Sequence, residues 1–164
     1  MATKNLSEFD ANSVPSGKGM RIAIVAAEWN WEITGAMARG ASETLASNGV
    51  NPEDIEMVTV PGTFELPLGG QLMADTGRFD AVILIGCVIQ GETRHFDFIC
   101  QGVTQGTTDL NLKYNLPFIF GVLTTGNQQQ ALDRAGGIHG NKGDEAAVAA
   151  LKMVTLKRNL QANK

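Results

Sequence analysis

Four runs of apolar and β-branched residues constrain this chain more than any other feature, because each is followed by a segment with the apolar spacing of a helix. The runs cover residues 21–27, 55–60, 80–90 and 117–125. The third run, DAVILIGCVIQ, is apolar at nearly every position, which is typical of a strand buried on both faces. Parallel neighbouring strands need a crossover connection, usually a helix. The pattern therefore predicts an α/β fold, a three-layer αβα sandwich in which helices cover both faces of a four-stranded parallel sheet.

The segments between and after these runs have helical periodicity. In the first of them, apolar residues recur every four positions from Ile33 to Leu45, and Asn30 is expected to cap the start of the helix. Helices are predicted at residues 30–48, 64–75, 96–110, 127–137 and 143–160. No internal repeat or Pro/Ser-rich linker divides the chain, so residues 1–164 are expected to form one domain, with a polar arm over residues 1 to about 17.

Composition argues against several classes of protein. The formal net charge of -4 gives no general electrostatic attraction to nucleic acid or to an anionic membrane. The longest apolar run is far shorter than the roughly 20 residues that span a bilayer, and the N-terminal residues lack the apolar core of a signal peptide, so a cytoplasmic protein is expected. Two cysteines, Cys87 and Cys100, and two distant histidines do not have metal-ligand spacing, so we expect reduced thiols and no metal site.

Polar and aromatic residues follow each predicted strand. Trp29 comes after the first strand, PGTFE (61–65) after the second, and GETRH (91–95) after the third. Open parallel sheets bind ligands beyond the carboxyl ends of their strands, so the functional site is expected at this edge. Trp29 is either a packing residue or a stacking surface for a planar ring, and Glu65 either stabilises a helix dipole or accepts a hydrogen bond from a ligand.

The turn after the third strand offers two readings. Neither the GxxxxGK[ST] nor the GxGxxG nucleotide motif is present, so a nucleotide site has no support. The amides of Gly91, Glu92 and Thr93 are expected at the positive end of a helix, where they form either an anion site or an ordinary turn with Thr93 as N-cap. His95, beside Arg94 in the first helical turn, should favour its neutral form, which suits either an acid–base catalyst or a structural histidine.

Two cations further along the chain have the same ambiguity. Arg134, in LDRAGG, and Lys142, in GNKG, are candidate counter-charges for an anion at the strand ends. Surface cations in contact with water are the alternative.

Five segments of the chain resemble the 6,7-dimethyl-8-ribityllumazine synthase family in order and spacing. They are AEWNWEITGAMARGA, VPGTFELPL, AVILIGCVIQGETRHFDFIC, PFIFGVLTTGNQQQALDRAGG and GNKGDEAAVAALKM, and the resemblance runs from about Met20 to Leu160. It implies a flavodoxin-like fold and a transferase of riboflavin biosynthesis that needs neither a metal nor an organic cofactor. The implied reaction condenses 5-amino-6-(D-ribitylamino)uracil with 3,4-dihydroxy-2-butanone 4-phosphate and releases phosphate and water.

The resemblance also implies roles for individual residues, with Phe120 and Arg134 supplied by a neighbouring subunit. The positions that match pyrimidine and ribityl contacts are Trp29, Thr63, Phe64, Glu65, Cys87, Val88, Ile89 and Phe120. The positions that match phosphate contacts are Glu92, Thr93, Arg134 and Lys142. His95 matches the acid–base catalyst. Gln90 stands where an arginine is common in the family, which leaves the positive potential near the phosphate to other groups.

The implied partners are the two small-molecule substrates and further copies of the chain. Family resemblance implies a homopentamer, either free, paired as a decamer, or assembled with eleven others into a 60-subunit shell, and the short segment GGIHGNKG favours the shell. Riboflavin synthase is a further candidate partner, whereas nucleic acid and membranes are not expected. A non-catalytic flavin- or lumazine-binding relative and a shell scaffold are the alternative functions, and the presence of both His95 and Arg134 favours the enzyme.

Overall fold

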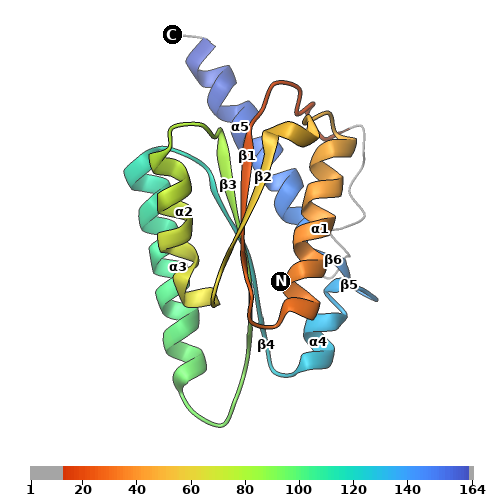
Figure 1. Ribbon diagram of the computed structural model, residues 1–164, viewed down its shortest axis with the longest axis vertical. Coiled ribbons are helices and arrows are strands. Elements are labelled where there is room, and N and C mark those ends of the chain that lie inside the picture. The colour runs from red at the N-terminus through yellow and green to blue at the C-terminus, as the bar shows by residue number, and fades with distance from the viewer. Residues whose placement is uncertain (1–12, 163–164) are drawn as a thin grey trace.

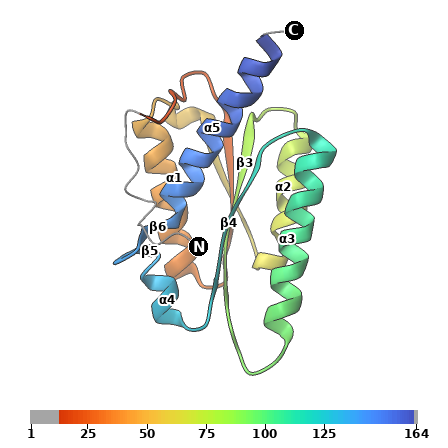
Figure 2. The same cartoon turned by 180° about the vertical axis from the view of Figure 1, so that it is seen from behind.

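A computed structural model describes residues 13–162, and within this range four parallel strands lie between two layers of helices (Figure 1). The sheet order is β2-β1-β3-β4, with bounds β1 (Ile22–Ala27), β2 (Ile55–Val60), β3 (Ala81–Ile89) and β4 (Phe118–Thr125). One face is covered by α1 (Trp31–Ser47), α4 (Gln128–Leu132) and α5 (Lys142–Ala162). The other face is covered by α2 (Leu66–Asp75) and α3 (His95–Tyr114), as Figure 2 shows from behind. The predicted fold class is confirmed.

The central strands are apolar throughout because both of their faces are buried. Even-numbered residues of β1 belong to the apolar cluster beneath α1 and α5, and odd-numbered residues belong to the cluster beneath α2 and α3. Every residue of β1 is fully buried. Burying one aliphatic side chain of this size contributes about 1.5–3 kcal/mol, so the two clusters together are the main source of stability.

Strand register sets the level at which each loop leaves the sheet. Ala27, the last residue of β1, is paired with Val60, and Ala26 is paired with Ile85 of β3. The final residues of β3 therefore extend roughly 10 Å beyond the ends of β1 and β2, at about 3.3 Å per residue. They are paired on their other side with β4, where Ile89 lies opposite Thr125. The end of β3 is thus flanked by the loops that follow β1 and β2.

The predicted strand bounds agree closely with those observed, but the helix predicted over residues 127–137 is wrong in its second half. Helix α4 ends at Leu132, and a short antiparallel hairpin follows, β5 (Ala135–Gly137) and β6 (Gly140–Asn141). Gly136 and Gly140 have φ angles of 113° and 69°, which glycine adopts readily and which a helix does not allow. The hairpin brings Lys142 back to Arg134, where the Lys142 amide donates to the Arg134 carbonyl at 2.9 Å.

Two features of the sequence fall at the limits of the described range. Residues 1–12 of the predicted polar arm lie outside the described residues, as do residues 163–164. Gly17, at the end of the predicted arm, is buried, and its amide donates to the carbonyl of Asn48 at 2.8 Å. No helix within residues 13–162 has the length and apolar character needed to cross a membrane.

Helix α5 begins in close contact with α1, at glycines that leave no room for a side chain. A Cβ atom added at Gly143 would overlap the carbonyl group of Met37, and one added at Gly40 would overlap the side chain of Asn141. Asn141 links the two helices, because its Nδ2 donates to the Ala36 carbonyl at 3.0 Å and its Oδ1 accepts from the Gly143 amide at 2.8 Å. This contact fixes the start of α5 and, with it, Lys142.

We expect Gly143→Ala to lower the free energy of unfolding, because the added methyl group meets backbone that cannot move aside. Overpacking of this kind costs about 1–3 kcal/mol, more than the roughly 1 kcal/mol that alanine gains over glycine in a helix. Urea denaturation at fixed protein concentration measures the change. Gly126→Ala is the matched control, since its nearest neighbour atom lies 3.5 Å away. Equal stability of the two variants would contradict the packing argument.

Candidate active site

The loops after β1 and β2 meet at the carboxyl edge of the sheet, and two of the predicted site residues converge there. The Trp29 amide donates to the Pro61 carbonyl at 3.0 Å, which ties the two loops together. The Trp29 ring is 67% exposed and lies beside Gly62. A Cβ atom at Gly62 would lie 3.0 Å from Oε2 of Glu65 and still closer to the Trp29 ring. The missing side chain at Gly62 therefore allows Trp29 and Glu65 to approach each other.

The three residues of the second loop have different environments. Glu65 has one carboxylate oxygen, Oε2, that is buried and without a hydrogen-bond partner among residues 13–162. Buried polar atoms are normally paired, so this oxygen is suited to accept from a ligand hydroxyl. Thr63 is buried, and its hydroxyl contacts the backbone of Cys87, so its side chain is already engaged within the protein. Phe64 is exposed and lies against Gly102 of α3.

The end of β3 contributes a neutral and mostly apolar wall. Burial raises the pKa of the Cys87 thiol to about 11, which favours the protonated, less nucleophilic form at neutral pH. Val88 and Ile89 are half-buried. Among residues 13–162, no group of three or more His, Cys, Asp or Glu side chains is placed to hold a metal ion.

The turn between β3 and α3 presents free backbone amides. Helix α3 begins at His95 with Arg94 as its N-cap, so the alternative in which Thr93 is the N-cap is wrong. Within the described range, the amides of Glu92 and Thr93 donate no hydrogen bond, and both residues are exposed. They precede the positive end of a twenty-residue helix, an arrangement that favours an anion.

His95 and Arg94 differ in what they can contribute to this turn. His95 is exposed, and its backbone amide donates to the Thr93 hydroxyl at 3.4 Å. Its imidazole is therefore accessible to a bound ligand. Arg94 is paired with Asp97 one turn along the helix, at 3.5 Å, so its charge is already partly balanced.

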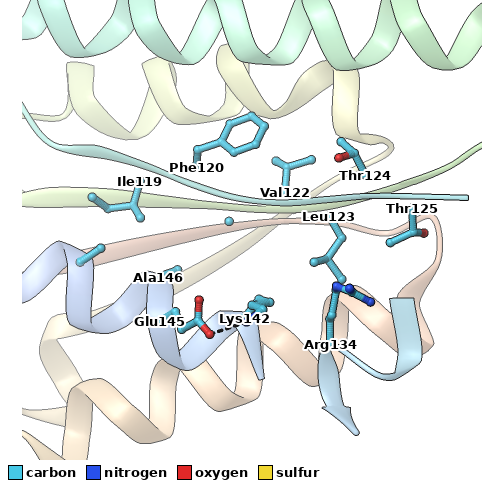
Figure 3. A pocket seen from close by; sticks show the side chains of 12 residues that line it. Ile119, Phe120, Val122, Leu123, Thr124, Thr125, Arg134, Lys142, Glu145 and Ala146 are labelled. Carbon is cyan, nitrogen blue, oxygen red and sulfur yellow. Dashed lines mark hydrogen bonds and ion pairs between the residues drawn. The ribbon is translucent and has the colours of Figure 1, made fainter. Parts of the chain in front are cut away.

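A second group of predicted residues lies elsewhere, in a cleft of about 450 Å³ along β4, which forms an edge of the described sheet. Figure 3 shows that Phe120 projects from one side of β4, whereas Leu123 and Thr125 project from the other, toward Arg134 and Lys142. The Arg134 guanidinium donates to the Gln130 carbonyl at 2.9 Å. The cleft thus follows the edge of β4, with Phe120 on one side of the strand and the two cations on the other.

Lys142 is held in this cleft by an ion pair with Glu145, one turn further along α5. Both side chains are about three-quarters buried. The carboxylate therefore offsets part of the Lys142 charge, and Arg134 is the less constrained of the two cations.

Phe120 lies far from the strand-end residues of its own chain. It is paired with Leu84, five residues before the end of β3, which places its backbone roughly 16 Å from that end at 3.3 Å per residue. Trp29 follows β1, on the far side of β3 from β4. The predicted site residues thus belong to two groups: Trp29, Thr63, Phe64, Glu65, Cys87, Val88, Ile89, Glu92, Thr93 and His95 at the strand ends, and Phe120, Arg134 and Lys142 along the β4 cleft.

This architecture defines a flavodoxin-like α/β protein whose strand ends offer a planar-ring surface, a carboxylate, free amides and a histidine. Comparison with known proteins narrows the class. Residues 19–158 match the sequence model of the family described as 6,7-dimethyl-8-ribityllumazine synthase. The chain belongs to this family. The predicted family and the predicted enzyme class, a transferase of riboflavin biosynthesis, are confirmed.

Curated relatives of the same description cover almost the whole chain. The protein from Parabacteroides distasonis is 58% identical over 153 residues, which is 93% of this chain and 96% of the relative. The protein from Porphyromonas gingivalis is 55% identical over 157 residues, or 96% and 98% of the two chains. The protein from Flavobacterium johnsoniae is 54% identical over 160 residues, or 96% and 84%.

Sequence patterns missed the contact made by Asn30 and the place of Glu145. Asn30 was expected to cap α1, but its side chain makes no capping bond and donates to the Cys87 carbonyl instead. Glu145 lines the β4 cleft and was not predicted.

We expect the Cys87 thiol to resist alkylation until the pH approaches 11. In a Cys100→Ser variant, iodoacetamide should react slowly with folded protein at pH 9, where the unfolded chain in urea is about half ionised. Because folding raises this pKa, the fold favours the protonated thiol, and the stability this contributes is lost as pH rises from about 9 to about 11. Mass spectrometry measures the reaction. Equal rates for folded and unfolded chains at pH 9 would contradict a buried, neutral thiol.

Proposed function

We propose that the protein condenses 5-amino-6-(D-ribitylamino)uracil with 3,4-dihydroxy-2-butanone 4-phosphate at a site formed between two neighbouring copies. The observation that carries this proposal is the distance between Phe120, in the β4 cleft, and the strand-end residues of its own chain. We call the strand-end group and the β4-cleft group two half-sites. Each half-site has an aromatic ring and groups suited to an anion, and neither is complete alone. A head-to-tail contact between copies would place the β4 cleft of one against the strand ends of the next.

The pyrimidine substrate has matching groups in the first half-site. The exposed Trp29 ring offers a face on which the pyrimidine stacks, and such aromatic contacts contribute about 0.5–1.5 kcal/mol beyond the area buried. The unpaired carboxylate oxygen of Glu65 accepts from a ribityl hydroxyl. Cys87, Val88 and Ile89 form the wall beside the ring, and Phe120 of the neighbouring copy covers it.

The phosphate substrate is bound by charge and by backbone amides. The free amides of Glu92 and Thr93 donate to the phosphate oxygens at the start of α3. Arg134 of the neighbouring copy completes the site, with Lys142 close to it. Negative charge grows on the phosphate as its bond to carbon breaks, so donors that are already in place stabilise the transition state more than the bound substrate.

His95 is suited to move the protons of the reaction. The 5-amino group adds to the substrate ketone and water leaves, which gives an imine. A proton then leaves carbon as phosphate departs, and the ribitylamino nitrogen closes the second ring with loss of water. His95 lies three residues after Glu92, so an imidazole at the start of α3 is within reach of the carbon that loses its proton beside the phosphate.

The proposed assembly is a pentamer, and the short segment over residues 136–143, which spans most of the β5–β6 hairpin and the start of α5, favours twelve pentamers in a 60-subunit shell. Several large apolar side chains of the described residues are more than half exposed on α2 and α3, which supports burial between copies; they are Leu68, Leu72, Phe98 and Leu112. Riboflavin synthase, which would consume the product, stays a predicted partner.

We expect the wild-type protein to form lumazine and release phosphate in equal amounts from the two substrates, and His95→Ala to slow this reaction about 100- to 10,000-fold. Lumazine absorbance and a phosphate assay measure the two products. His139→Ala is the matched control, because His139 is the chain's other histidine and lies in the exposed β5–β6 turn. An unchanged rate in His95→Ala would contradict its role, and no product above the spontaneous background would favour a binding protein.

Mixing two inactive variants tests whether the site lies between copies. We expect His95→Ala and Arg134→Ala to be slow as separate assemblies, and their co-assembled mixture to regain activity. In a random mixture, about a quarter of the contacts pair an intact strand-end half-site with an intact β4 cleft. Light scattering verifies co-assembly and measures its size. A co-assembled mixture no faster than the average of its parents would contradict a shared site.

A further inference from the structure

Asn30 connects the loop that carries Trp29 to the end of β3. Its side-chain Nδ2 donates to the Cys87 carbonyl at 3.1 Å, although the two residues are far apart in the sequence. The same carbonyl accepts from the Thr63 hydroxyl at 3.4 Å, and that hydroxyl accepts from the Cys87 amide at 3.2 Å. Side chains from the loops after β1 and β2 thus bind the same residue of β3.

The consecutive residues Trp29 and Asn30 are held from opposite sides. The Trp29 amide donates to Pro61 in the loop after β2, whereas the Asn30 side chain donates to Cys87 of β3. The sheet order places β1 between these two strands, so the pair of residues bridges them. The Trp29 ring is exposed, yet the backbone that carries it is fixed on both sides.

Asparagine meets two requirements at position 30. Its φ of 61° and ψ of 39° are in the left-handed region, which asparagine, aspartate and glycine tolerate best. The contact to a carbonyl also needs a side-chain donor, which aspartate and glycine lack. The carbonyl of Asn30 meanwhile accepts from the amides of Ile33 and Thr34 at the first turn of α1.

We propose that Asn30 is a positioning residue for the pyrimidine substrate: its side-chain amide, bound to the Cys87 carbonyl, fixes the Trp29 ring in its stacking position. This rests on the proposed role of Trp29. The bond restricts the backbone that follows Trp29, and the Trp29 ring lies against Gly62. Without the amide, Trp29 samples other orientations before it stacks, and that ordering cost lowers affinity.

Three variants separate the amide from the backbone conformation. Asn30→Gly and Asn30→Asp retain a residue that tolerates the left-handed region but remove the donor, and Asn30→Ala removes both features. Asn115→Gly is the matched control, because Asn115 is the other left-handed non-glycine residue within residues 13–162, with φ of 46°, and it lies at the far end of α3. Trp29→Ala tests the proposed stacking itself.

We expect Asn30→Gly and Asn30→Asp to raise the KM for the pyrimidine substrate about three- to tenfold, as loss of one hydrogen bond predicts. The KM for the phosphate substrate should change less than about twofold, since its groups lie in the β3–α3 turn and the neighbouring cleft. The affinity for the product can be measured from the quenching of Trp29 fluorescence in a Trp31→Phe background. This affinity should weaken by the same factor. Tm of the Asn30 variants should stay close to that of Asn115→Gly.

Each outcome decides one claim. If Trp29→Ala binds the pyrimidine as tightly as the wild type, the proposed stacking is wrong. If Trp29→Ala weakens binding and Asn30→Gly does not, the positioning role is wrong. If only Asn30→Ala is impaired, backbone conformation alone explains the residue, and the amide has no role. If both KM values rise together with a lower Tm, Asn30 is structural and the inference fails.

Discussion

The register of β3 against its neighbours is the constraint on which the strand-end site depends. Because Ile85 lies opposite Ala26, the last residues of β3 pass the ends of β1 and β2. The Cys87 backbone is then exposed to both neighbouring loops, and both bind it. A shift of one residue would also turn every side chain of β3 to the opposite face, so burial of both faces enforces the register that the site needs.

Two glycines complete this arrangement by leaving space. A Cβ atom at Gly86 would lie 2.8 Å from the Thr63 hydroxyl oxygen, so the absence of a side chain there lets Thr63 reach the backbone of Cys87. In the same way, the absence of a side chain at Gly62 leaves space for the Trp29 ring and the Glu65 carboxylate. Neither glycine has the left-handed φ that would require glycine for conformation alone, so close packing is the reason for both.

The sequence predicted those parts of the structure that follow from local periodicity. Apolar runs identified the central strands β1 and β3 because both of their faces are buried, and runs rich in apolar and β-branched residues identified β2 and β4 at the edges of the described sheet. The spacing of four identified α1 because one side of it covers the sheet. The β5–β6 hairpin was missed because five residues, three of them glycine, carry no period, and their pairing depends on close contact with α4 and α1. The Asn30 contact was missed for another reason. Asparagine is common both as a side-chain N-cap and in left-handed backbone, so the residue type alone does not show which bond its side chain makes. The bond to Cys87 depends on the register of β3 against β1, which local sequence does not reveal.

The proposed division of the site between strand ends and a sheet edge has a thermodynamic consequence. In the proposed assembly, a ligand that contacts Trp29 of one copy and Arg134 of the next binds the assembled state and not the separate chains. By linkage, the free energy with which the ligand stabilises the contact between copies equals the free energy with which that contact strengthens ligand binding. In that assembly the exposed side chains of Trp29, Phe64 and α2 have two roles. They hold the copies together, and the same contact excludes water from the substrates. In the proposed assembly, selection for catalysis and selection for assembly therefore act on the same surface.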